Sequence, residues 1–537
     1  MDTQKRLLLA TALSFLVFVV WALVFKPSEP VSSGVPSSIV SNDRGGSSSP
    51  VLQNRVDSGF PVGGVSSKGE VQVVETPLYK VSLNRLGGWM SSFNLKSFHD
   101  RALVVAGEEA GFLLRCESCN FTLPPSIPFV QKSSSSQEVV YEWSSPELLL
   151  RKIYRFSEDK YLIDLKLEVL ARKAQGVSGR LGIAWVGAEL PSPNSGGPFG
   201  FLKTPPDLKQ VVYLSGGNVI RKVPSKEESK GADSGLIAWA GLEDRYFLRA
   251  LITRELTQEQ SLTYRLNQGT SELVFYTPSF SIPSSHRQVF QFSAFVGPKR
   301  LELLKELGVG LEKTIDYGML SVLALPILYL LKFFHNFVAN WGVCIILLTL
   351  FVKALLNPLT LKGLHQMKAM QKLQPELAAL REKFAGDKQR LNTETMNLFK
   401  RHKVNPVGGC LPMLLQMPIY IALYKVLYNS IELYQTPFFG FYKDLSAPDP
   451  YFILPVILGL FMFLQQKLTP NPSADPSQAR IMMFMPIMFT AFMLFLPVGL
   501  VVYILVNTVM SVLQQWMHQK GILWRDLFRG RFNPRTA

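Results

Sequence analysis

Six long apolar runs constrain the fold of this 537-residue chain more than any other feature. They cover residues 7–25, 341–360, 411–431, 451–466, 481–496 and 498–517. A helix needs roughly 20 apolar residues to cross a bilayer, and tilt or local thinning accommodates the shorter runs. The chain is 47% hydrophobic and carries a formal net charge of +16, a combination that is rare in soluble proteins. We therefore expect a polytopic α-helical membrane protein with six spans, of which the last five form a helical core over residues 341–517.

Basic residues between the runs predict the orientation of the spans. Residues 361–404 contain ten Lys and Arg residues against four acidic residues, and the positive-inside rule places such a segment in the cytoplasm. Residues 432–450 are weakly acidic and belong outside, whereas the basic tail 518–537 belongs inside. Six spans with both termini in the cytoplasm satisfy all three conditions.

Three further segments complete the predicted topology. Residues 1–26 show no small-residue cleavage site, which favours an uncleaved transmembrane anchor over a removed signal peptide. The Ser-, Gly- and Pro-rich residues 27–70 predict a flexible linker. The apolar run 317–331 contains Pro326 and would reverse the orientation of all later segments if it spanned. We therefore expect an interfacial helix on the outer surface within residues 314–340.

Residues 71–313 are expected to form a large exported domain with an all-β sandwich fold. Apolar and polar residues alternate over much of 71–298, for example at 161–169 and 290–296, and Gly, Pro and Ser clusters separate the strands. Such short, alternating strands are typical of a β-sandwich. Residues 299–313 then predict an amphipathic helix.

No residue pattern in the chain predicts an enzyme, a cofactor or a metal site. The sequence contains no Walker A loop, no GxGxxG after a predicted strand and no HExxH. His99 and His286 are isolated in sequence, and no nucleic-acid recognition module is evident. Cys116 and Cys119 form one CxxC without a second pair, which favours a local disulfide or two unreactive thiols over zinc. We expect the exported domain to bind or to serve as a scaffold.

The basic segment 361–404 is expected to fold as a helical hairpin. Its apolar residues recur in steps of three and four on either side of a turn at 385–387. They are Leu364, Met367, Met370, Leu373, Leu377, Leu380 and Phe384, followed by Leu391, Met396, Leu398 and Phe399. Packing of these stripes would expose the basic residues. That basic face is either a solvated surface that only fixes topology or a docking surface for a partner, anionic lipid or RNA.

Two polar stripes run along the predicted spans. They comprise Thr349, Lys353, Asn357 and Thr360 on the second span, and Tyr503, Asn507, Ser511 and Gln514 on the last. The spacing of four, four and three residues puts each set on one helix face, from mid-span to the cytoplasmic end. Together with Gln416 they predict a hydrophilic groove that opens to the cytoplasm and is closed outside.

Lys353 is the cation of this predicted groove. A lysine at the bilayer centre costs roughly 2.5–3.5 kcal/mol on insertion scales. The five C-terminal spans contain no Asp or Glu that could pair with it. Lys353 therefore either faces a wet groove or extends its amine to the cytoplasmic headgroups.

The third and fifth spans carry methionine-rich apolar faces. They include Met417, Pro418 and Ile419 on one span and Phe484, Met485 and Pro486 on the other. Methionine is flexible and polarizable, which suits contacts with varied apolar partners. These residues are either an apolar slide for a substrate or ordinary packing and lipid-facing surface.

Several motifs then resemble one family, the YidC-type membrane protein insertases. The second span, with Trp341-Gly, Thr349, Val352-Lys353 and Asn357-Pro-Leu-Thr, resembles that of the family. Similar matches follow in order at 404–412, 416–419, 449–455, 484–487 and 497–503, and at 296–298 and 316–318 in the exported part. The bacterial family usually has arginine where this chain has Lys353. The charge is kept, whereas the planar, bidentate guanidinium is not.

The resemblance implies a membrane protein insertase and folding chaperone of the Gram-negative inner membrane. A hydrophilic segment of a nascent membrane protein would enter the groove from the cytoplasm, and its apolar helix would leave along the apolar slide into lipid. The resemblance also implies the ribosome and Sec translocon components as partners. The alternatives are a solute transporter with an exported sensory domain and a passive scaffold of a secretion complex.

Overall fold

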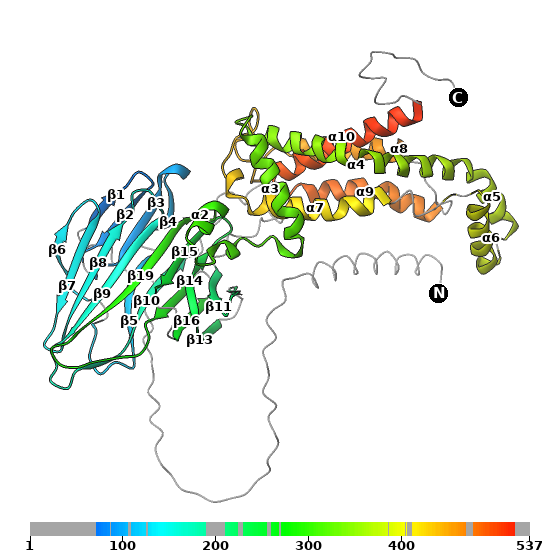
Figure 1. Cartoon of the computed structure of the whole chain (residues 1–537). Coiled ribbons are helices and arrows are strands. Elements are labelled where there is room, and N and C mark those ends of the chain that lie inside the picture. The colour runs from blue at the N-terminus through cyan, green and yellow to red at the C-terminus, as the bar shows by residue number, and fades with distance from the viewer. Residues whose placement is uncertain are drawn as a thin grey trace, which may run out of the picture. The chain divides into compact units, whose positions relative to one another are not determined.

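The computed structural model describes residues 71–520, apart from 86, 106–108, 125–126, 189–209, 224–228, 255–258, 268–269, 385, 403, 405–410 and 469–475. The expected anchor 1–26, the expected linker 27–70 and most of the tail 518–537 therefore lie outside the described residues. Figure 1 shows the described strands in blue to green and the long helices in green to red.

The exported domain contains two antiparallel sheets. The first, ten-stranded sheet has the order β1-β2-β3-β5-β10-β17-β16-β13, with β4 on β3 and β18 on β10; the second, nine-stranded sheet has the order β12-β11-β14-β15-β19-β9-β8-β7-β6. The bounds are β1 (Val71–Glu75), β2 (Tyr79–Asn84), β3 (Met90–Leu95), β4 (Arg101–Val104), β5 (Ala110–Glu117), β6 (Val130–Ser134), β7 (Glu138–Ser144), β8 (Leu148–Phe156), β9 (Leu162–Ala171), β10 (Val177–Ala188), β11 (Gln210–Ser215), β12 (Asn218–Lys222), β13 (Ser229–Gly235), β14 (Ile237–Glu243), β15 (Phe247–Thr253), β16 (Gln260–Asn267), β17 (Thr270–Tyr276), β18 (Phe280–Ile282) and β19 (Arg287–Pro298). The predicted β-sandwich is confirmed.

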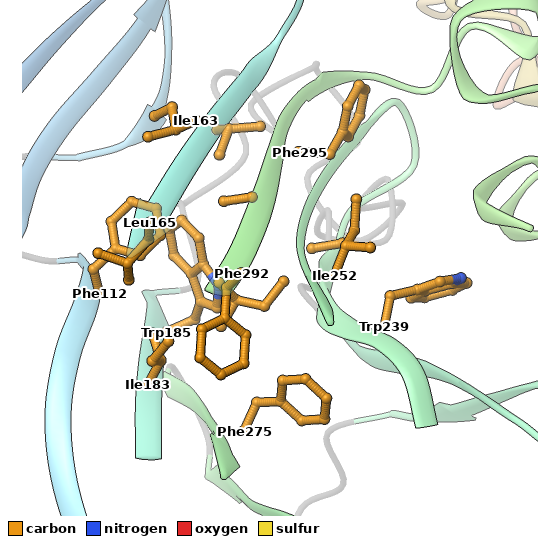
Figure 2. Packing of buried hydrophobic residues seen from close by; sticks show 14 of the residues in the cluster. Phe112, Ile163, Leu165, Ile183, Trp185, Trp239, Ile252, Phe275, Phe292 and Phe295 are labelled. Carbon is orange, nitrogen blue, oxygen red and sulfur yellow. The ribbon is translucent and has the colours of Figure 1, made fainter. Parts of the chain in front are cut away.

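The core of the exported domain lies between these sheets. Residues that alternate in sequence point alternately inward and outward, so Ile163 and Leu165 of β9 and Phe292 of β19 are buried. Figure 2 shows them packed with Trp185, Phe275 and other large side chains. Burial of each such side chain contributes about 1.5–3 kcal/mol, so this core supplies most of the domain's stability.

Lys152 is a buried cation inside this apolar core. It occupies an inward position of β8, and its Nζ donates to the carbonyls of Gly87, Gly88 and Phe112 at 3.1, 3.2 and 2.9 Å. All three carbonyls belong to left-handed backbone, with φ of 87°, 50° and 62°. Such backbone cannot continue a regular ladder, so the ammonium group supplies a donor to carbonyls that the sheet does not pair, and the Tyr154 hydroxyl donates to the Gly88 carbonyl as well, at 2.6 Å. Burial lowers the pKa of Lys152 to about 7.

The helix predicted over residues 299–313 is wrong in extent. The structure has a short α2 (Leu301–Glu306) and a 3₁₀ turn, η2 (Leu311–Thr314). Gly308 and Gly310 separate them with φ of 66° and 81°, which ends the helix. The apolar side is nevertheless as predicted, because Leu301, Leu304 and Leu311 are all buried.

Cys116 and Cys119 form a disulfide bond, with Cα atoms 6.0 Å apart. Cys116 lies in β5, and Cys119 packs against the backbone of Gly179 in β10. This pairing is the first of the two outcomes that the isolated CxxC predicts. The bond closes a turn beside the sheet.

The C-terminal part is helical. Its elements are η3 (Gly318–Leu320), α3 (Ser321–His335), α4 (Trp341–Lys372), α5 (Gln374–Lys383), α6 (Lys388–Arg401), α7 (Leu411–Asn429), η5 (Ile431–Leu433), α8 (Ile453–Leu468), α9 (Pro476–Met493) and α10 (Val498–Lys520), and η1 (Lys96–Phe98) lies in the exported domain. By length and composition, three of the described helical segments suffice to cross a membrane: Gly318–His335, Trp341–Lys372 and Val498–Lys520. Ile453–Leu468 and Phe484–Met493 are shorter apolar helices.

A helical C-terminal region with apolar helices is thus confirmed, while the six spans and the five-helix core stay predictions. The segment Gly318–His335 includes the run expected to lie along the outer surface, and it is long enough to span. Its interfacial placement also stays a prediction.

The expected cytoplasmic hairpin is present with a different first helix. Helix α4 continues without a break from the span to Lys372, and α5 begins after Leu373, with Pro375 in its first turn. Leu373, Leu377, Leu398 and Phe399 form a small buried core between α5 and α6. Met396 was expected in this core but is 48% exposed.

A candidate polar groove between three helices

Helix α4 presents the first polar stripe. Asn340 caps its N-terminus, with its side-chain oxygen accepting from the Val343 amide at 3.1 Å. Thr349 and Lys353 follow on the buried face, where they are 1% and 7% exposed. The Thr349 hydroxyl donates to the Ile345 carbonyl at 2.7 Å, so it is satisfied within its own helix.

The second stripe, on α10, meets the first directly. Lys353 Nζ donates to Ser511 Oγ at 2.7 Å. About one turn further toward the C-terminal end of α10, Gln514 Nε2 donates to Asn357 Oδ1 at 3.1 Å. The two stripes predicted from spacing therefore face one another. Thr360 is the exception, because its hydroxyl donates back to the Leu356 carbonyl of α4 at 3.0 Å.

Helix α7 contributes the third side. Gln416 Nε2 donates to the Tyr503 hydroxyl at 3.1 Å, and Asn507 Nδ2 donates to the Tyr420 hydroxyl. Sequence reasoning missed Tyr420, although its spacing of four from Gln416 puts both on one face of α7. We call the set formed by Thr349, Lys353, Asn357, Gln416, Tyr420, Tyr503, Asn507, Ser511 and Gln514 the polar cluster.

The polar cluster is partly buried in this structure, and its members Asn357, Gln416, Tyr420 and Ser511 are half-buried. Tyr503 and Asn507 are 1% and 6% exposed, and the helices meet through the hydrogen bonds described above. A hollow that opens to the cytoplasm stays a prediction. Two acceptors of the cluster, Asn507 Oδ1 and Gln514 Oε1, are buried without a hydrogen-bond partner among the described residues. Leaving such an acceptor unpaired costs roughly 1–3 kcal/mol of free energy. A hydrogen bond from an incoming donor would recover part of this cost.

An apolar layer lies toward the N-terminal end of α4 from the polar cluster. Cys344, Ile345 and Leu348 of α4 pack with Leu423 of α7 and Leu500 of α10 in one buried group. No polar stripe continues into this part of α4, as the sequence predicts. The N-terminal half of the predicted span in α4 is thus apolar, and the polar stripe lies in its C-terminal half.

Within the described ranges, no carboxylate pairs with the charge of Lys353. In the part of the chain that the structure describes, its ammonium has one polar partner, the neutral hydroxyl of Ser511. An ammonium group can donate three hydrogen bonds, so donor capacity remains. Lys353 is buried between helices, which disagrees with the alternative in which its amine extends to the headgroups.

The predicted apolar slide is only partly exposed. Phe484 and Met485 of α9 are 61% and 41% exposed. Met417, Pro418 and Ile419 of α7 are half-buried. Pro486 is buried, which is a correction, because its place in α9 turns it away from the face that carries Phe484.

Comparison with known proteins defines the class first. A family model described as the 60Kd inner membrane protein matches residues 333–523, and one described as the YidC periplasmic domain matches residues 72–330. The fold is thus that of an inner membrane protein with a periplasmic domain. The membrane protein insertase YidC of Syntrophus aciditrophicus is 35% identical over 96% of this chain and 99% of its own length. That of Geotalea daltonii is 33% identical over 97% and 99%.

The chain therefore belongs to the YidC family of membrane protein insertases. A crystal structure of an active YidC insertase is also similar, at 18% identity and a TM-score of 0.37 over 82% of this chain and 91% of that one. The protein is an insertase, a function that is not enzymatic, and the alternative of a solute transporter is not favoured. The exported domain is periplasmic.

Proposed function

We propose that the polar cluster receives a hydrophilic segment of a nascent membrane protein from the cytoplasm and holds it at membrane depth. The observation that carries this proposal is Lys353, a buried cation with one neutral partner in the described part of the chain. An acidic side chain of a substrate would supply the missing carboxylate. The unpaired oxygens of Asn507 and Gln514 would accept from donors of the same segment.

The energetic logic is local replacement of water. A polar segment in hydrocarbon loses its hydration. Each backbone group that then lacks a hydrogen bond costs roughly 2–7 kcal/mol. Side chains that already exchange hydrogen bonds between helices can exchange them with a substrate instead. The lysine attracts negative charge more strongly than in water, because the surroundings have a low dielectric constant.

The substrate's apolar helix then leaves into lipid along α9 and α7. Phe484 and Met485 offer exposed apolar surface on α9, and Met417, Pro418 and Ile419 offer half-buried surface on α7. Contacts of this kind place no demand on sequence, which suits clients of different composition.

The orientation follows from charge. We place both termini and the α5–α6 hairpin in the cytoplasm, and the six spans in the inner membrane. The exposed basic residues of the hairpin, such as Lys383 and Arg390, support a docking surface for ribosome, Sec translocon components or anionic lipid. Leu377 of α5 and Phe399 of α6 belong to one buried cluster that holds the hairpin together. The basic surface is therefore carried by a folded unit.

Insertion of one client with and without its acidic residues tests the role of Lys353. We expect Lys353→Arg to work about as well as the wild type and Lys353→Leu to fail on the acidic client, with about tenfold less insertion. The same variant should suffer less on the client that lacks acids. Lys353→Glu should fail more broadly because it repels acidic segments.

Lys467→Leu is the matched control, since Lys467 is an exposed lysine at the end of α8. It should insert both clients normally. Equal insertion of the two clients by Lys353→Leu would show that the charge does not select substrates.

A further inference from the structure

The outer end of α7 is capped by the periplasmic domain. The last carbonyls of a helix have no partner within it. One of them, the Tyr428 carbonyl, accepts from Arg245 Nε at 2.7 Å. Arg245 belongs to the turn between β14 and β15, so the donor comes from a segment far away in the sequence.

The guanidinium of Arg245 is held between two aromatic rings. Its central carbon lies 3.5 Å from the ring centroid of Tyr428 and 4.6 Å from that of Tyr246. A planar cation on an aromatic face contributes about 0.5–2 kcal/mol, and a cation also suits the negative end of a helix dipole. Hydrogen bond, stacking and dipole therefore act together at this helix end.

Apolar packing surrounds the cap. Tyr246 and Phe247 of the domain lie against Tyr434, with ring centroids 4.8 and 5.5 Å apart. Ala422 and Val426 of α7 belong to the same buried cluster as the strands. The outer half of α7 thus packs on the domain over several residues, and Arg245 supplies the directional contact.

This half of α7 also carries part of the polar cluster. Tyr420 lies two turns before Tyr428, or about 12 Å along the helix. Pro418 lies just before it and removes one backbone hydrogen bond of the helix, so the turns from Ile419 to Asn429 are partly uncoupled from those before. A change at the outer end would therefore displace Tyr420 relative to Asn507.

From this geometry we infer that Arg245 is a positioning residue of the insertase, through which the periplasmic domain holds α7 against α10. The inference rests on the proposed function, because it assumes that the polar cluster receives substrate. It assigns the periplasmic domain a mechanical part in insertion that requires no ligand of that domain.

Hydrogen exchange and client insertion, both measured on the full-length protein in proteoliposomes, test the inference together. In Arg245→Ala we expect peptides covering residues 419–430 to exchange about tenfold faster, the effect of losing a hydrogen bond from a charged donor. Peptides from β14 and β15 should keep their protection. Insertion of a client should fall by a similar factor.

Conservative and matched variants define the cause. Tyr428→Phe keeps the ring and the carbonyl, so its exchange should match the wild type. Arg245→Lys keeps the charge without the planar fork and should be intermediate. Arg254→Ala is the control, because Arg254 is 55% exposed and pairs with Asp164 away from α7. It should change neither exchange nor insertion.

Each divergent outcome overturns the inference. Faster exchange with normal insertion would show that the cap does not serve the insertase, and reduced insertion with normal exchange would place the role of Arg245 elsewhere. If Arg245→Ala also lost protection in β14 and β15, Arg245→Lys would decide by the same criteria. Since α7 exchange does not depend on Lys353, a failed charge test at Lys353 would refute the proposed function and leave the capping result standing.

Discussion

The two halves of the molecule each bury a lysine that has no carboxylate partner among the described residues, and the two lysines differ in their hydrogen bonds. In the periplasmic domain, Lys152 Nζ donates to three backbone carbonyls, which uses every proton of the ammonium group. In the membrane part, Lys353 Nζ has the hydroxyl of Ser511 as its one polar partner in the described chain. Lys152 thus donates all the hydrogen bonds that its ammonium group can make, whereas Lys353 keeps donor capacity that is not used within the described chain.

This difference separates a structural cation from one available to a substrate. Removing Lys152 would take a donor from three carbonyls, of which that of Gly88 keeps the Tyr154 hydroxyl at 2.6 Å. Removing Lys353 would leave one hydroxyl that already donates to the Asn507 carbonyl at 2.8 Å. The stability of the fold should therefore depend on Lys152, and insertion should depend on Lys353. Three predictions test the contrast.

The largest effect is expected from Lys152→Met. The substitution keeps the length of the side chain but removes a donor from three carbonyls, of which only that of Gly88 keeps another described side-chain donor, the Tyr154 hydroxyl. Each acceptor left unpaired costs roughly 1–3 kcal/mol, partly offset by the desolvation that the lysine no longer suffers. We expect a net loss of about 3 kcal/mol in the free energy of unfolding of the periplasmic domain. Urea unfolding of the full-length protein in detergent, followed by tryptophan fluorescence, to which Trp185 and Trp239 of the domain core contribute, measures it.

Lys353→Met is the matched variant for this comparison. Its free energy of unfolding should change by less than about 1 kcal/mol, because the cost of a buried cation is relieved. A large loss of stability in Lys353→Met, or none in Lys152→Met, would break the distinction between the two lysines.

Sequence reasoning predicted one of these lysines and not the other, for a physical reason. Lys353 stands out because its neighbours in an apolar helix are apolar and its partners recur at helical spacing on α4 and α10. Lys152 sits at an inward position of β8, and its acceptors, including Gly87 and Phe112, are backbone atoms from distant segments. Backbone carbonyls leave no mark in the sequence, so the partners of Lys152 could not be found there.

Other outcomes follow the same rule. Alternation predicted β2, β9 and β19 because burial of one strand face depends on local pattern. The break of the helix after Glu306 follows from Gly308 and Gly310, which were visible in sequence but outweighed by the leucine spacing. Tyr420 was missed because a tyrosine in an apolar helix is as typical of lipid-facing surface as of a polar contact.

The next effect is a pH dependence that Lys152 should give the stability of the periplasmic domain. Burial lowers the pKa of Lys152 to about 7, whereas an unfolded lysine has a pKa of about 10.4. Between these values the unfolded chain binds the extra proton, so the free energy of unfolding should rise with pH by up to about 1.4 kcal/mol per unit, and this contribution should be flat below pH 7. Urea midpoints at three pH values between about 7.5 and 9.5 measure the slope.

Neighbouring groups do not titrate in this window. Burial raises the pKa of Tyr141 to about 12 and that of Tyr154 well above its usual range. The slope should therefore disappear in Lys152→Met. An equal slope in that variant would assign the pH dependence to another group and refute the account of Lys152.

The smallest effect is expected from Ser511→Ala, which removes the one described polar partner of Lys353. If that partner only occupies the ammonium until a substrate arrives, its loss should cost less than about 1 kcal/mol of stability, since a single hydrogen bond contributes about that much. Insertion of an acidic client should stay within about twofold of the wild type, because the substrate's carboxylate replaces the hydroxyl. The same client assay used for the Lys353 variants measures this. A loss of insertion as large as that of Lys353→Leu would show that Ser511 orients the lysine, and the polar cluster would then resemble the saturated site of Lys152 more than an open receptor for substrate.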